Sequence, residues 1–293
     1  MRHRKPNKLL SIIALFCSLF FFTGCGGGSS GGGSNGSVNP PSPPSDDLNN
    51  WYWRNPLPTG NSLNGVTYGN GMFIAVGENG TILSSADDIT WTSRTSGTTN
   101  NLVGVTYGNG TFVAVGDNGT ILTSADGITW TSRTSSTTAV LTGVTYGNGT
   151  FIAVGWYGTI LTSTDGITWT SSASGTTAFF YGAACGNGTF IAVGGSSNNS
   201  SNSTILTSAD GITWTSRASG TTNVLYGVTY GNGTFIAVGF SGSGIILTSA
   251  DGITWTSRSS DTLSYLTGVT YGNGTFIVVG GSGTILQAEP ANN

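Results

Sequence analysis

The chain after residue 50 is a succession of short apolar runs separated by turn residues, and this pattern occurs six times. Residues 104–130, GVTYGNGTFVAVGDNGTILTSADGITW, show one full copy. The six copies start at Gly65, Gly104, Gly143, Gly182, Gly227 and Gly268, so successive starts are 39, 39, 39, 45 and 41 residues apart. A repeat near 40 residues is typical of β-propellers.

Each full copy contains four apolar runs, which predict four strands. The runs are rich in Val, Ile, Thr, Tyr, Phe and Trp, which favour a half-buried pleated surface. Asn-Gly pairs supply the positive φ angles that tight hairpins need. No part of the array shows a helical period, so we expect an all-β domain of four-stranded antiparallel sheets.

The two ends of the array indicate how it closes. The sixth copy stops at Gln287, before its Trp-bearing fourth run, but residues 51–54 match that missing run, with Trp51 and Arg54 spaced like Trp130 and Arg133. We therefore predict a six-bladed β-propeller over residues 51–289, closed by an N-terminal strand that completes the last blade, with a tail at 290–293. The alternative, a linear β-solenoid, leaves residues 51–54 unexplained and needs polar end caps.

The first 24 residues have the pattern of a secretory signal. Four basic residues precede an apolar run of 14 residues at 9–22, shorter than the roughly 20 residues that a membrane-spanning helix needs. The end of this segment, Phe22-Thr-Gly-Cys25, resembles the lipobox of bacterial lipoproteins, although Phe22 departs from the usual aliphatic residue. The resemblance implies cleavage before Cys25, lipidation of Cys25 and a place in the bacterial cell envelope. Because Gly26 follows, it implies the outer membrane or cell surface; ordinary secretion is the alternative.

Residues 25–50 join this cysteine to the repeats. They are dominated by Gly, Ser and Pro, with Val38 and Leu48 as the only large apolar residues after Cys25. Such a segment cannot bury enough apolar surface to fold, so we expect a disordered tether.

Composition excludes several functions for the processed chain. Four of the nine Lys and Arg residues lie in the signal, which leaves five against twelve acidic residues and a net charge of −7. Nucleic acid is therefore not an expected partner. His3, the only histidine, is also lost, so no imidazole remains for a catalytic triad or a metal site, and we expect no cofactor. Cys185 replaces a repeated Tyr and is expected to be a buried, unreactive residue.

Five hairpin segments resemble Asp-box (BNR) repeats: SADDITW ends at Trp91, SADGITW at Trp130, Trp214 and Trp255, and STDGITW at Trp169. They have one residue fewer between Asp and Gly than the usual pattern. The resemblance covers about residues 51–288 and implies a propeller of the sialidase-like superfamily. Physically, each carboxylate can accept backbone N–H bonds, which assigns a structural role to Asp87, Asp126, Asp165, Asp210 and Asp251.

Sialidase chemistry is not expected, because the processed chain's five arginines occupy one repeat position and cannot converge on a central pocket. They lie two residues past the Thr after each Trp, with Ser172 in the third copy. A solvated or stacking role is favoured over an acidic partner. Hydrolysis of glycans by a carboxylate pair remains an alternative through Glu78 and Asp117, at matching positions of adjacent blades.

The positions where the copies differ are the best guide to binding. The turn after the second strand and the segment leading into the first strand vary, and in a four-stranded blade both lie at the same end. Seven aromatic residues at this end are candidates for stacking on sugars or anchoring a protein: Trp156, Tyr157, Phe179, Tyr181, Tyr226, Phe240 and Tyr265. Packing between blades is the alternative explanation for each.

The pattern as a whole is similar to lipoprotein propellers that assist photosystem II assembly. We expect a membrane-tethered, non-enzymatic propeller that binds a protein or glycan through its variable end. A glycan-degrading enzyme and a structural or adhesion surface protein are the alternatives.

Overall fold

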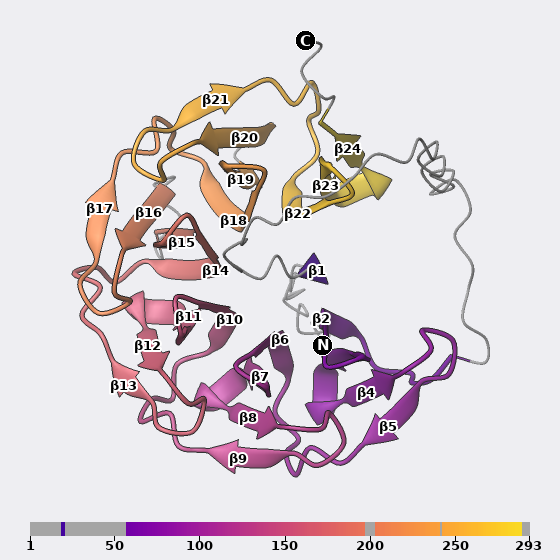
Figure 1. Cartoon of the computed structure of the whole chain (residues 1–293). Helices are drawn as coiled ribbons and strands as arrows, with labels where there is room; N and C mark the ends of the chain where they lie inside the picture. Colours follow the sequence, from indigo (N-terminus) through magenta and orange to yellow (C-terminus); the bar gives the residue numbers. More distant parts are fainter. Residues whose placement is uncertain (1–18, 21–56, 197–202, 241, 289–293) are drawn as a thin grey trace, which may run out of the picture.

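The computed structural model describes residues 19–20, 57–196, 203–240 and 242–288. Six sheets stand around a ring and form a six-bladed β-propeller of four-stranded antiparallel blades, as predicted (Figure 1). Within each blade the strands pair in chain order, from the innermost to the outermost. In the part of the chain that the structure describes, no helix could cross a membrane.

The strands of the first three blades have the following bounds. Blade 1 is β2 (Leu63–Gly69), β3 (Met72–Gly77), β4 (Ile82–Ser85) and β5 (Thr92–Arg94). Blade 2 is β6 (Leu102–Gly108), β7 (Thr111–Gly116), β8 (Ile121–Ser124) and β9 (Thr131–Arg133). Blade 3 is β10 (Leu141–Gly147), β11 (Thr150–Gly155), β12 (Ile160–Ser163) and β13 (Thr170–Ser171).

The remaining strands complete the ring. Blade 4 is β14 (Phe179–Gly186), β15 (Thr189–Gly195), β16 (Ser203–Ser208) and β17 (Thr215–Arg217). Blade 5 is β18 (Val224–Gly231), β19 (Thr234–Phe240), β20 (Gly244–Ser249) and β21 (Thr256–Arg258). The described strands of blade 6 are β22 (Leu266–Gly272), β23 (Thr275–Gly280) and β24 (Ile285–Gln287). A further two-residue strand, β1 (Leu19–Phe20), pairs in parallel with β2, in a segment that the sequence assigns to the signal.

Asn-Gly pairs form the hairpins between the first and second strands. At the β6–β7 turn, Asn109 has a φ of 46° and Gly110 a φ of 74°. Glycine takes this left-handed region freely, and asparagine enters it more readily than most residues. The repeated Asn-Gly therefore sets the register of each hairpin, as the sequence predicts.

The core lies between blades. One cluster joins Ile74 and Val76 of blade 1 to Leu102, Val105 and Phe112 of blade 2, and the other clusters repeat this arrangement around the ring. Each blade is therefore stabilised mainly by its neighbours, because a single small sheet buries too little apolar surface alone.

A close contact between glycine and tyrosine links adjacent inner strands. A Cβ atom added to Gly108 would lie 2.1 Å from Cγ of Tyr146, which belongs to the next blade. In blade 4, Cys185 stands in place of this tyrosine and covers Gly147 in the same way. Cys185 is half-buried rather than buried, because it packs at the end of the core cluster and not inside it.

Among the described residues, no strand pairs with the outer edge of β24. Ile285 is 63% exposed, whereas its counterparts Ile82 and Ile121 are fully buried. The residues predicted to cover this edge, 51–54, lie outside the described residues, so closure by the N-terminal strand stays a prediction.

Candidate binding face

The two faces of the ring are built from different segments. On one, here called the hairpin face, lie the turns between the third and fourth strands. On the other, the variable face, lie the turns after the second strands and the segments leading into the first strands. These segments bond to one another across blades: Asn79 N donates to Asn101 Oδ1 at 3.0 Å.

The aspartates of the hairpin face hold the hairpins together. Oδ1 of Asp126 accepts N–H bonds from Ile128 and Thr129, both at 2.8 Å, and the Ser124 hydroxyl at 2.9 Å. These backbone N–H groups, with the serine hydroxyl, lower the pKa of Asp126 to about 2. Asp87, Asp210 and Asp251 have the same contacts and a pKa of about 2, and the pKa of Asp165 is lowered for the same reason. The structural role predicted for these residues is confirmed.

The arginines lie on the outermost strands, and their side chains run towards the hairpin face. Arg133 is opposite Ile121 in the sheet, but its Nε donates to Thr123 Oγ1 at 2.8 Å, two residues closer to the hairpin. Arg94, Arg217 and Arg258 make the equivalent bonds to Ser84, Thr207 and Thr248. The prediction of a ring at the outer strands is confirmed for these four; Arg54 lies outside the described residues.

Three aromatic residues of the variable face form a compact group, here called the aromatic platform. The rings of Trp156 and Phe179 are stacked, with centroids 4.9 Å apart and planes at 4°. Tyr157 meets Phe179 edge-on at 5.0 Å. Trp156 and Tyr157 belong to the turn η3 (Trp156–Gly158) of blade 3 and Phe179 to blade 4, so the platform spans a blade boundary.

Tyr157 holds an unfavourable backbone conformation at the surface. Its φ is 57° and its side chain is 64% exposed. The same turn in blades 1 and 2, η1 (Glu78–Gly80) and η2 (Asp117–Gly119), places Asn79 and Asn118 at this position with φ of 54° and 53°. Asparagine tolerates this region, and a bulky residue there is unusual. The fold therefore makes this turn without tyrosine, a point that only the backbone angles reveal.

The other four candidate aromatics form two pairs, and each pair also crosses a blade boundary. Tyr181 and Tyr226 have ring centroids 5.2 Å apart, and Phe240 and Tyr265 meet edge-on at 6.2 Å. Burial raises the pKa of both Tyr181 and Tyr226, and Tyr226 adds a smaller electrostatic effect on Tyr181. All seven residues thus combine packing between blades with partial exposure. Ligand binding and packing between blades, the two explanations offered from sequence, are therefore not exclusive.

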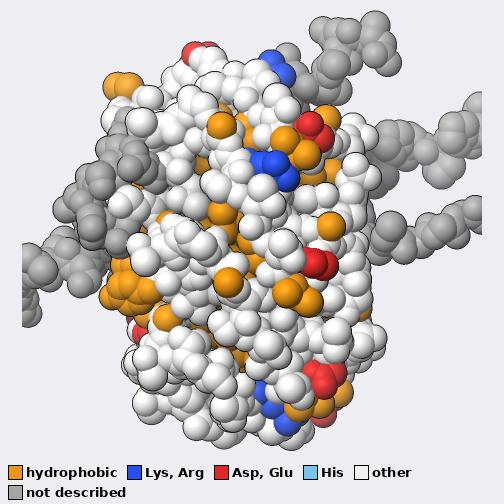
Figure 2. Space-filling view, turned by 90° about the vertical axis from the view of Figure 1, so that its left-hand side faces the viewer, with side chains coloured by type: hydrophobic (Ala, Val, Ile, Leu, Met, Phe, Trp, Pro, Cys, Tyr) orange, Lys and Arg blue, Asp and Glu red, His pale blue; other side chains and the backbone are white. Residues whose placement is uncertain are grey.

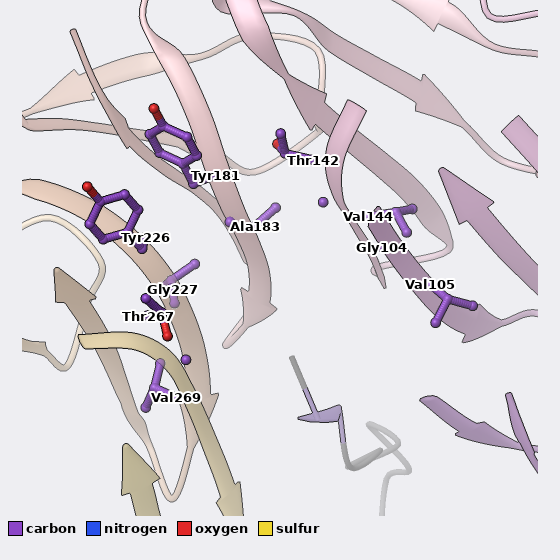
Figure 3. A pocket seen from close by; sticks show the side chains of 14 residues that line it. Gly104, Val105, Thr142, Val144, Tyr181, Ala183, Tyr226, Gly227, Thr267 and Val269 are labelled. Carbon is purple, nitrogen blue, oxygen red and sulfur yellow. The ribbon is translucent and has the colours of Figure 1, made fainter. Parts of the chain in front are cut away.

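Tyr181 and Tyr226 also stand beside a small cavity between the inner strands of blades 2 to 6. With β1 inside the ring, this cavity has a volume of about 30 Å³. Figure 3 shows the two rings next to each other with their hydroxyls pointing the same way, away from Val105 and Val144. A water needs roughly 10–15 Å³, so with β1 in place the cavity admits water but no organic ligand.

Glu78 and Asp117, the carboxylate pair considered from sequence, begin the equivalent turns η1 and η2 of adjacent blades. Asn101 Nδ2 donates to Asp117 Oδ2 at 2.9 Å, and Ser62 N approaches Glu78 Oε2 at 3.4 Å. Both carboxylates thus contact the lead-in segment beside their own turn. In the described residues no group of three or more His, Cys, Asp or Glu side chains could hold a metal ion.

These features define a six-bladed β-propeller with a repetitive hairpin face, which carries charged side chains and exposed isoleucines, and an aromatic variable face. No protein-family profile and no curated protein matches the chain. Among solved structures, it is similar to YCF48 bound to a D1 peptide, with a TM-score of 0.63 and 18% identity over 79% of this chain and 79% of that chain.

Two further structures are similar at the level of the fold. YCF48 from Cyanidioschyzon merolae has a TM-score of 0.60 and 17% identity, covering 80% of this chain and 84% of that one. The computationally designed Ika8 protein has a TM-score of 0.60 and 10% identity, covering 77% and 70%. At these identities, the likeness establishes the propeller fold.

Proposed function

We propose that this protein is a non-enzymatic β-propeller that binds a protein partner through its variable face, with the aromatic platform as the main anchor. The observation that carries the proposal is Tyr157. Two sibling blades make the same turn with asparagine, so the tyrosine is unfavourable for the backbone and unnecessary for the fold. Backbone strain of this kind concentrates at functional sites.

The shape of the platform supports a protein partner. Exposed Trp and Tyr side chains are enriched where protein interfaces are anchored, because they bring a large apolar area with little loss of side-chain entropy. The fold has a precedent for binding a peptide, since the similar protein YCF48 has been solved bound to a D1 peptide.

The carboxylates support a role without catalysis. Asp117 accepts a hydrogen bond from Asn101, and Glu78 approaches the backbone of residue 62, so each has a local contact in its own blade.

The N-terminal residues support a cellular location. We propose export, cleavage before Cys25 and a lipid anchor in the bacterial cell envelope, with residues 25–50 as the tether. Labelling with a radioactive fatty acid should mark the wild-type protein and not Cys25→Ser; equal labelling of the two proteins contradicts the anchor.

The Ser-x-Asp hairpins support a relation to Asp-box propellers.

The binding proposal is tested by panning a random peptide library on the purified protein. Selected peptides should bind Tyr157→Asn at least tenfold more weakly than wild type. A matched control is Ile167→Ser, which alters an exposed residue of the same blade on the hairpin face. Peptides that bind both variants as tightly as wild type would contradict the proposal. A glycan array that yields Tyr157-dependent ligands, when the peptide library yields none, would also contradict it.

A further inference from the structure

The charges of this protein are divided unevenly between its two faces. The hairpin face carries six aspartates, two of them in blade 1, and the four described arginine side chains run towards it. Of its grooves, one brings Asp126 and Asp165 together with Arg133. Positive and negative groups are therefore mixed on this face.

The variable face is mainly acidic. Its turns and lead-in segments, as far as the structure describes them, contain Glu78, Asp117 and Asp261 and neither lysine nor arginine. Arg133 and Arg258, at the ends of outer strands, line grooves that also contain residues of these segments. In the edge-on view of Figure 2, acidic side chains recur along the right-hand side with apolar and basic ones nearby, and a broader apolar patch lies at the left-hand edge.

Two of these carboxylates are in line with the aromatic platform. The turns η1, η2 and η3 have nearly the same backbone angles, with φ of 54°, 53° and 57° at their middle residues. Glu78, Asp117 and Trp156 therefore occupy one position in three consecutive blades. A ligand lying along this arc meets two carboxylates and then the stacked aromatic rings.

We infer that the protein segment that docks on the variable face is cationic, with an arginine or lysine next to an apolar side chain. This inference rests on the proposed function and adds the chemistry of the partner. The ammonium or guanidinium group pairs with the carboxylates, and an arginine also stacks on an aromatic face. The apolar neighbour covers Tyr157 and the exposed part of Trp156.

The test uses the pool of peptides selected on the purified protein, compared with a pool selected on the double variant Glu78→Gln, Asp117→Asn. The wild-type pool should be enriched in arginine or lysine beside apolar residues, and the variant pool should not. A wild-type-selected basic peptide should bind the variant about threefold to tenfold more weakly, and added salt should weaken its binding to wild type more than to the variant.

Asp88→Asn is the matched control, because it removes one carboxylate from the hairpin face of the same blade as Glu78. It should leave both the enrichment and the affinity unchanged. Selected peptides without basic residues, or the same loss of affinity with Asp88→Asn as with the double variant, overturn the inference while leaving the docking face intact. A library that yields no Tyr157-dependent peptide overturns both this inference and the proposed function.

Discussion

Replacing Tyr157 by asparagine should leave the stability of the propeller nearly unchanged. The left-handed conformation costs an ordinary residue about 1–2 kcal/mol, and asparagine much less. Against this gain, the edge-on contact with Phe179, at 5.0 Å, is worth about 0.5–1.5 kcal/mol. The two effects oppose each other, so the free energy of unfolding should stay within about 1 kcal/mol of wild type.

Urea titration followed by far-UV circular dichroism measures this change. Two variants calibrate it. Asn118→Tyr introduces the strained tyrosine in blade 2, where Val140 stands in place of Phe179, and should cost about 1–2 kcal/mol. Phe180→Ala, at a fully buried position, should cost about 3–5 kcal/mol. If Tyr157→Asn destabilises the protein by more than about 2 kcal/mol, the tyrosine has a structural role and the argument for a binding site fails.

Three other predictions concern the ring itself. Gly108→Ala forces a Cβ to 2.1 Å from Tyr146 and should lower the free energy of unfolding by about 1–3 kcal/mol. Gly143→Ala, whose nearest new contact is 3.5 Å, should leave the thermal midpoint unchanged or slightly raised. Equal midpoints for the two variants would refute the proposed blade contact. Asp87, Asp126, Asp210 and Asp251 have folded-state pKa values lowered from 3.8 to about 2. Their contribution to stability is therefore complete above about pH 4 and is lost as the pH falls towards 2. Thermal melts between pH 7 and 2 should show this decline in stability, and the decline should be smaller in Asp126→Asn. Deleting residues 51–54 should speed amide hydrogen exchange in β24, and unchanged exchange there would contradict closure by the N-terminal strand.

Features encoded within one repeat could be predicted from the sequence. Asn-Gly pairs, β-branched runs and the Ser-x-Asp segments each act over a few residues, so the strands, the hairpins and the role of Asp126 followed from the pattern. The number of blades followed from the number of copies, because each copy forms one sheet.

Features that depend on two blades could not be predicted in the same way. The stacking of Trp156 on Phe179 joins residues of different repeats, and the sequence gives no distance between them. The direction of the Arg133 side chain depends on which hydroxyl it reaches, and only the structure assigns it to Thr123. The strain at Tyr157 was visible in the sequence only as a tyrosine where two other copies have asparagine.

The central claim is that the aromatic platform contacts a protein partner. It is tested most directly by hydrogen–deuterium exchange of the purified protein with and without a saturating peptide selected on it. Exchange should slow in η3 and at the start of β14, where Trp156, Tyr157 and Phe179 lie. Slowing confined to the hairpin face, for example around Asp165, would contradict the claim.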